Sequence, residues 1–183
     1  MQMGFFFDQT RCSGCEACRL ACRQWHGEAE DAVDLLTVTE WESGRFPDVS
    51  VKWTVVPCLH CAEPLCAAAC PAGVIAKSPG DGIVTVDTEM CLGNGVCGAP
   101  CRDACPYGAP RFRNGPDAKM QKCELCLQRL SAGKKPICVD ACPMRALDAG
   151  PLPELEAKRG TVRAVEGFRY APEARPSVVF KAK

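Results

Sequence analysis

The chain has 183 residues, with 22 acidic and 22 basic side chains, a formal net charge of +0 and 47% hydrophobic residues. This length allows one domain or two small ones, and the balanced charge gives no support to nucleic-acid binding, which requires a basic patch. No apolar run reaches the roughly 20 residues of a transmembrane helix, so we expect no direct membrane span.

Sixteen cysteines dominate the composition and could form disulfides, zinc sites or iron-sulfur clusters. The first residues, MQMGFFFD, lack the basic start and long apolar run of a signal peptide, which argues against a secreted disulfide scaffold. Zinc sites combine two short Cys or His hooks and require neither a third cysteine beside the hook nor a fourth before proline. Iron-sulfur ligation is therefore favoured, and the chain should fold poorly without its clusters.

The first predicted element is a short buried strand at residues 4–8, which leads into the first cysteine group. This group consists of Cys12, Cys15, Cys18 and Cys22. Its spacing is that of a bacterial ferredoxin, although no proline follows the last cysteine. Gly14 lets the loop turn inward and direct backbone N–H groups at cluster sulfurs, and a short helix should begin near Cys18.

Three side chains near the cysteines have two interpretations each. Trp25 and His26 on the predicted helix, and His60 in the second group, either border a cluster or pack the fold. The chain has only 2 histidines, and neither has ligand spacing to the other, so we favour packing.

Residues 24–56 separate the first two cysteine groups. Residues 27–34 are acidic and predict a surface loop. Residues 35–41 and 49–56 alternate apolar and polar side chains around a turn at 43–47, which predicts a β-hairpin.

The second and third groups indicate a two-cluster ferredoxin unit. Group two consists of Cys58, Cys61, Cys66 and Cys70, and group three of Cys91, Cys97, Cys101 and Cys105. A Pro-Gly-Asp-Gly turn and a strand at 83–86 join them. Because the cysteine before proline ligates the other cluster of such a unit, Cys70 and Cys105 should cross over.

Group three has a second interpretation, because its spacing is longer than the simplest one. Asn94 could occupy the second ligand position, with Cys101 as the fourth ligand and an insertion before Cys105. One cluster would then be a 3Fe-4S cluster. We prefer four cysteine ligands, because Cys101 and Cys105 repeat the spacing of Cys66 and Cys70.

Group four consists of Cys123, Cys126, Cys138 and Cys142, with a helix-like insertion at 127–136. A short helix at 152–158 and a strand at 177–180 follow, and the tail is predicted to lie on a partner or on the body. Since groups two and three pair, group one pairs with group four.

The predicted fold is therefore α+β, with two ferredoxin-like two-cluster units nested in sequence. The first unit comprises residues 1–23 plus 107–150, and the second comprises 57–106. Residues 24–56 form the hairpin insertion and 151–183 the C-terminal arm.

Three motifs point to a known family: CLHCAEPLCAAACP in group two, CPYGAP after Cys105, and KPICVDACPMRALDAG around group four. Together with the four groups, they resemble the iron-sulfur (B) electron-transfer subunits of the dimethyl sulfoxide reductase family of molybdopterin oxidoreductases. The resemblance covers nearly the whole chain.

The resemblance implies four 4Fe-4S clusters in a line. They would carry electrons between a molybdopterin catalytic subunit, containing Mo or W, and a quinone-reactive membrane anchor subunit or another redox partner. The chain would be peripheral on the cytoplasmic membrane through its partners, or soluble and cytoplasmic. No nucleophile, base or substrate pocket is visible, so we expect no catalysis within the chain. The alternative function is a free-standing polyferredoxin shuttle.

The resemblance also implies four ligand sets and their order. Set A is Cys12, Cys15, Cys18 and Cys142; set B is Cys22, Cys123, Cys126 and Cys138; set C is Cys58, Cys61, Cys66 and Cys105; set D is Cys70, Cys91, Cys97 and Cys101. Set A should lie nearest the catalytic subunit, followed by set B. Set C comes next or last, with set D as its neighbour.

Overall fold

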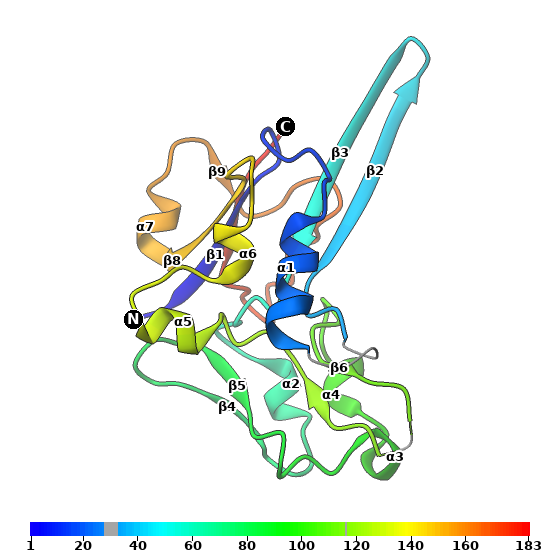
Figure 1. Ribbon diagram of the computed structural model, residues 1–183, viewed down its shortest axis with the longest axis vertical. Helices are drawn as coiled ribbons and strands as arrows, with labels where there is room; N and C mark the ends of the chain where they lie inside the picture. The colour runs from blue at the N-terminus through cyan, green and yellow to red at the C-terminus, as the bar shows by residue number, and fades with distance from the viewer. Residues whose placement is uncertain (28–32, 116) are drawn as a thin grey trace.

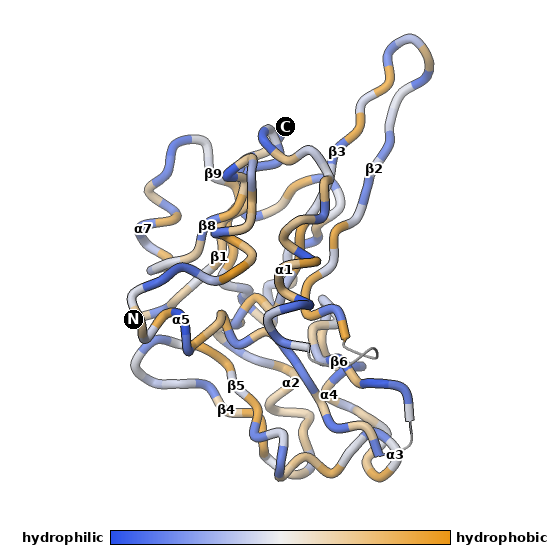
Figure 2. The backbone as a smooth tube through the Cα atoms, viewed as in Figure 1, coloured by the Kyte–Doolittle hydropathy of each residue, from blue (hydrophilic) through white to orange (hydrophobic). Residues whose placement is uncertain are grey.

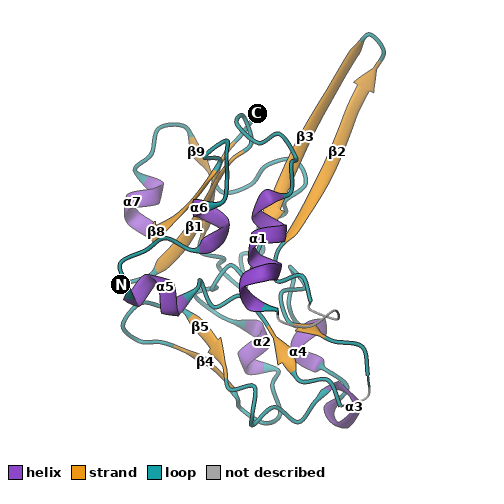
Figure 3. Cartoon of the chain, viewed as in Figure 1, coloured by secondary structure: helices purple, strands orange, loops and turns teal. Residues whose placement is uncertain are grey.

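The computed structural model describes residues 1–27, 33–115 and 117–183 (Figure 1). Residues 28–32 of the predicted acidic loop lie outside the described residues. The fold is mixed α/β with short helices and small sheets, coloured by type in Figure 3. None of the described helices is long and apolar enough to cross a bilayer.

The largest sheet joins the two ends of the chain, in the order β8-β1-β10-β9. Its strands are β1 (Met3–Asp8), β8 (Leu147–Pro151), β9 (Thr161–Val162) and β10 (Val178–Lys181). Strand β1 pairs antiparallel with β8 and parallel with β10. The strands predicted at 4–8 and 177–180 are therefore confirmed, and the end of the tail is a strand of the body.

The core begins on this sheet and continues into the cysteines. Phe5, Phe7 and Phe180 are buried on the sheet, and the Phe168 ring lies 4.6 Å from that of Phe180. The same buried cluster includes five thiols, those of Cys18, Cys22, Cys58, Cys123 and Cys138. The cysteine side chains are therefore part of the core.

The predicted hairpin is present as β2 (Thr37–Arg45) and β3 (Asp48–Val56), and it projects from the body (Figures 1 and 3). Strand β2 extends farther than predicted, because Ser43 and Gly44 pair with Ser50 and Val49 and the turn falls at residues 46–47. Hydrophilic and hydrophobic segments alternate along β3 in Figure 2, and its burial rises from the exposed Asp48 and Val49 at the tip to the buried Thr54 and Val55 at the base.

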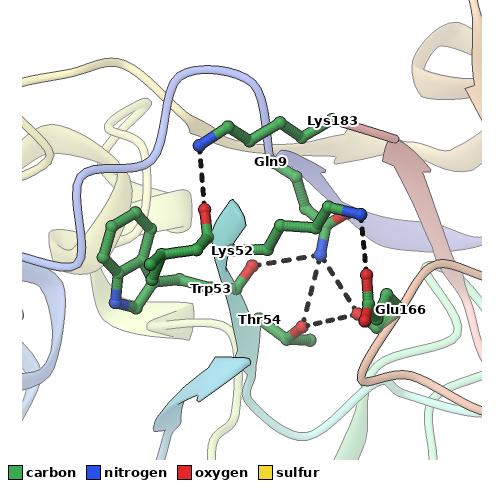
Figure 4. A network of polar contacts seen from close by, with 7 residues as sticks. Gln9, Lys52, Trp53, Thr54, Glu166 and Lys183 are labelled. Atoms are coloured by element: carbon green, nitrogen blue, oxygen red, sulfur yellow. Dashed lines mark hydrogen bonds and ion pairs between the residues drawn. The ribbon is translucent and has the colours of Figure 1, made fainter. Parts of the chain in front are cut away.

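Polar contacts attach the base of the hairpin to the body (Figure 4). Gln9 Nε2 donates to the Trp53 carbonyl at 3.1 Å, and Thr54 Oγ1 donates to the Glu166 carbonyl at 3.1 Å. Lys52 pairs with the Glu166 carboxylate at 2.6 Å. The hairpin is therefore held by the segment after β1 and by the tail.

Short helices carry many of the cysteines. They are α1 (Ala17–His26), α2 (Leu65–Ala68), α3 (Asn94–Cys97), α4 (Pro100–Asp103) and α6 (Ile137–Asp140). Helix α1 packs against α6, and α2 packs against α4 (Figure 1). Cysteine groups far apart in sequence are thereby brought side by side.

The remaining elements are short. They are β4 (Ile75–Lys77), β5 (Val84–Val86), β6 (Arg111–Phe112), β7 (Met120–Gln121), α5 (Leu127–Ser131) and α7 (Leu152–Glu156). Strands β4 and β5 pair antiparallel, which confirms the strand predicted at 83–86. The helix predicted at 127–136 ends earlier, at Ser131, and the one at 152–158 ends at Glu156.

Gly14 offers a mutational test of how the hairpin and the first cysteine loop fit together. A Cβ at this position, where φ is +71°, would lie 2.2 Å from Trp53 Nε1. We expect Gly14→Ala to lower the free energy of unfolding by about 1–3 kcal/mol more than a φ penalty alone, because Trp53 must move. Chemical denaturation of the anaerobic chain measures this difference.

Gly73→Ala is the matched control, because Gly73 also has a positive φ (+64°) but a Cβ there would meet no atom within 4 Å. Equal losses for the two variants would show that the contact between Trp53 and the loop contributes nothing.

Candidate metal centres

None of the sixteen cysteines, all of which lie among the described residues, forms a disulfide. Cys12, Cys15, Cys18 and Cys142, which form set A, line one cavity beside the first turn of α1. Its apolar walls include Phe7, Val38 and Val55. Two distant parts of the sequence, residues 12–18 and residue 142, therefore meet at one site.

The thiols of set A face backbone N–H donors. The Ala146 N–H lies 3.3 Å from Cys142 Sγ, and the Gly14 N–H donates to Cys12. Burial, with smaller contributions from the nearby Cys142 and Cys12 thiols, raises the pKa of Cys18 to about 11, against the lowering effect of the Arg19 N–H. A cationic metal cluster would offset this cost by binding the thiolates.

A second cavity is lined by the members of set D, which are Cys70, Cys91, Cys97 and Cys101. Val74, Phe112 and Met120 contribute its apolar walls. The Met120 N–H lies 3.4 Å from Cys91 Sγ. Sets A and D therefore have the same construction: four thiols, an apolar wall and backbone donors.

The side chain of Asn94 makes a local hydrogen bond, in which its Oδ1 accepts the Gly95 N–H at 3.0 Å. Among the described residues that line the cavity of set D, the ligand candidates are cysteines and Asn94 is not one of them. This arrangement favours four cysteine ligands over the interpretation with Asn94.

Set B is deeply buried between α1, α5 and α6. Burial raises the pKa of Cys123 to about 12, and it raises that of Cys138 well above the ordinary value. The thiols of Cys22, Cys123 and Cys126 all act on Cys138, so the four members of set B lie within electrostatic reach of one another. The Leu125 N–H donates to Cys123 Sγ at 3.4 Å.

Set C, which lies next to α2, also consists of thiols that affect one another's pKa values. Burial raises the pKa of Cys61 and of Cys66 to about 12, with further contributions from the neighbouring Cys58 and Cys105. The Ala109 N–H lies 3.4 Å from Cys105 Sγ. Cys105 thus meets the thiols of group two, whereas Cys70 lies with those of group three.

The donor chemistry fits iron-sulfur clusters. Each of the two pockets is lined by four thiols, which is the ligand number of a 4Fe-4S cluster. Backbone N–H groups directed at thiolate sulfurs are a feature of iron-sulfur sites, where they influence the reduction potential.

Of the two histidines that the sequence analysis assigned to packing, His26 contacts a cysteine, whereas His60 is packed in the core. His26 Nε2 lies 3.3 Å from Cys126 Sγ, so His26 borders a member of set B, and burial lowers its pKa. His60 is fully buried and its Nδ1 accepts the Val84 N–H at 3.0 Å. Within the described part of the chain, His60 Nε2 has no hydrogen-bond partner. A lone histidine gives no spacing signal in the sequence, so neither contact was predictable.

Trp25 agrees with the packing interpretation. It is 47% exposed, and the Arg129 guanidinium lies 5.1 Å from the centre of its ring.

Sixteen cysteines in four groups, with backbone N–H donors at their thiols, indicate an iron-sulfur protein. A family model described as a 4Fe-4S dicluster domain matches residues 49–152, which include cysteine groups two, three and four.

Relatives extend the likeness to group one. The sequence is 38% identical to the B component of the anaerobic dimethyl sulfoxide reductase of Escherichia coli K12, over 98% of this chain and 88% of that protein. It is 33% identical to the B component of the sulfite dehydrogenase of Allochromatium vinosum, over 94% and 78%. It is 31% identical to the nitrate-inducible formate dehydrogenase iron-sulfur subunit of E. coli K12, over 94% and 63%. The chain therefore belongs to the iron-sulfur (B) electron-transfer subunits of the dimethyl sulfoxide reductase family of molybdopterin oxidoreductases.

Proposed function

We propose that the chain holds four 4Fe-4S clusters, one on each of sets A to D, and relays electrons through them. Each cluster accepts and donates single electrons when bound. The chain's own residues supply the thiolates, exclude water and fix the distances between the clusters. The observation that carries the proposal is the meeting of Cys142 with Cys12, Cys15 and Cys18 around one apolar cavity.

The sixteen ligands are assigned as follows: Cys12, Cys15, Cys18 and Cys142 in set A; Cys22, Cys123, Cys126 and Cys138 in set B; Cys58, Cys61, Cys66 and Cys105 in set C; and Cys70, Cys91, Cys97 and Cys101 in set D. The assignment is supported by which thiols affect one another's pKa values.

The sets belong to two nested ferredoxin-like units, at residues 1–23 plus 107–150 and at 57–106. Two similar arrangements support this division. In the first unit α1 packs against α6 and β1 pairs with β8; in the second α2 packs against α4 and β4 pairs with β5. Residues 24–56 are the hairpin insertion and 151–183 the C-terminal segment.

The clusters follow the order A, B, C, D. Cys18 of set A raises the pKa values of the set B thiols Cys22 and Cys138, so these sets are neighbours. Cys58 of set C likewise raises the pKa of Cys123 of set B. These couplings support the third place for set C and leave set D at the far end.

The names of the relatives support a catalytic partner, because each relative is one component of a larger reductase or dehydrogenase. The chain serves a molybdopterin catalytic subunit at the set A end and a quinone-reactive membrane subunit, or another redox partner, at the set D end. Cys15 of set A is exposed and Cys97 of set D is partly exposed, which suits sites of electron entry and exit. Catalysis belongs to the partner, and the chain is held at the membrane by its partners.

Metal analysis and purification test this function. Anaerobically prepared protein should contain about sixteen iron atoms and a similar amount of sulfide per chain, four for each cluster. A large molybdopterin-containing subunit should copurify with the native chain. Zinc in place of iron, or about eight irons, would refute the cluster assignment, and a cluster-filled monomer would favour a free-standing polyferredoxin.

A further inference from the structure

Lys122 is a buried ammonium group directly before Cys123. The residue is only 5% exposed, and its Nζ donates to the main-chain carbonyls of Cys123, at 2.8 Å, and Val84. Across the described residues, the ion pairs do not include a carboxylate partner for Lys122. A buried charge is costly unless it is compensated, and two carbonyl dipoles compensate it only in part.

The two carbonyls place Lys122 between sets B and C. Cys123 belongs to set B, whereas Val84 lies on β5, in the unit that carries sets C and D. The ammonium group lowers the pKa of Cys123 in set B and that of Cys66 in set C, against the larger raising effect of burial. One cation therefore acts on thiols of two different sets.

The neighbouring His60 is neutral and adds no positive charge at this position. Burial, and then the ammonium groups of Lys122 and Lys77, lower the pKa of His60 well below its ordinary value. His60 is also fixed as the tautomer with a proton on Nε2, because Nδ1 accepts from the Val84 N–H. A neutral imidazole and the Lys122 cation are thus both bonded to the backbone of Val84.

We propose that Lys122 supplies one fixed positive charge that acts on the clusters of both set B and set C. The proposal rests on the proposed function. Four thiolates around a cubane core leave a net charge of about −2, which becomes more negative when an electron arrives. A cation between two such sites stabilises the reduced form of each. Lys122 thereby raises the reduction potentials of the two central clusters relative to those at either end.

Redox titration of the full cluster-filled chain, followed by electron paramagnetic resonance, tests this role. In Lys122→Met the ratio of reduced to oxidised cluster at a fixed potential should fall about tenfold for sets B and C, a shift of about −59 mV each. Sets A and D should change much less. Lys122→Gln, which keeps an N–H donor but loses the charge, should shift like Lys122→Met, whereas Lys122→Arg should retain the original potentials.

Lys119→Met is the matched control, because Lys119 is a lysine nearer the surface whose Nζ donates to the Glu89 carbonyl at 2.6 Å in an exposed contact. Solvent screens its charge, so its removal should leave all the potentials unchanged.

Unchanged potentials in Lys122→Gln, a shift of only one central cluster, or equal shifts of all clusters would overturn the proposal. Loss of the central clusters from Lys122→Arg as well would assign Lys122 to folding and also overturn it. Failure of the proposed function is separate, because it would appear in the unmodified chain as a wrong iron count or missing cluster signals.

Discussion

Removal of iron from the anaerobic chain is expected to unfold most of it. Thiols occupy positions that apolar side chains would fill in an ordinary core, as seen for Cys22, Cys123 and Cys138. The helices that carry many of the ligands are short, and α2, α4 and α6 have only 4 residues each. Such helices are marginal unless tertiary contacts hold them.

The magnitude follows from metal-binding free energies. Structural zinc contributes about 10–16 kcal/mol to the folding of small domains, and a whole domain is stable by about 5–15 kcal/mol. Loss of several clusters therefore exceeds the stability that remains. The sheet of β8, β1 and β10, with its Phe5, Phe7 and Phe180 core, is the part expected to retain structure longest.

Circular dichroism and hydrogen exchange before and after anaerobic chelation measure this effect. A sample given the same chelator already saturated with iron controls for effects of the reagent. An iron-free chain that kept the original melting temperature and exchange protection would contradict the prediction, because the apolar core alone would then be sufficient.

Much of the architecture was predictable where a local pattern determines it. Alternating side chains in residues 49–56 predicted β3, and GFFFD predicted β1. The prolines after Cys70 and Cys105 predicted that these cysteines leave their own groups, because ferredoxin spacing carries that information. The thiol of Cys70 acts on that of Cys101, and Cys105 acts on Cys61, which supports the crossover, and the ligand exchange itself stays a prediction.

Other features depend on contacts between distant residues, which no local pattern encodes. The parallel pairing of β10 with β1 joins Val178 to Phe5 across almost the whole chain. The contact between His26 and Cys126 spans 100 residues. Lys122 looks like any surface lysine in the sequence, and only the position of Val84 in the fold makes it a buried cation.

Replacing either of the two crossover cysteines, Cys70 or Cys105, by serine should remove or degrade a single cluster. We expect Cys70→Ser to destroy or degrade the cluster of Cys91, Cys97 and Cys101 while that of Cys58 survives. The reason is geometric, because Cys70 lines the cavity of set D and acts on Cys101. Cys105→Ser should have the reverse effect, because Cys105 acts on Cys61 and Cys66 of set C.

The two variants control for each other, since both replace a cysteine that precedes proline at the end of a short helix. Each should lose one to four of about sixteen irons, depending on whether a three-iron cluster remains. Iron analysis gives the loss, and electron paramagnetic resonance identifies which cluster signal disappears.

Because set D is the end of the proposed chain of clusters, Cys70→Ser should leave electron entry at set A intact, whereas Cys105→Ser should interrupt transfer between sets B and D. If Cys70→Ser removes the signal that Cys105→Ser is predicted to remove, the crossover is wrong and each group holds its own cluster.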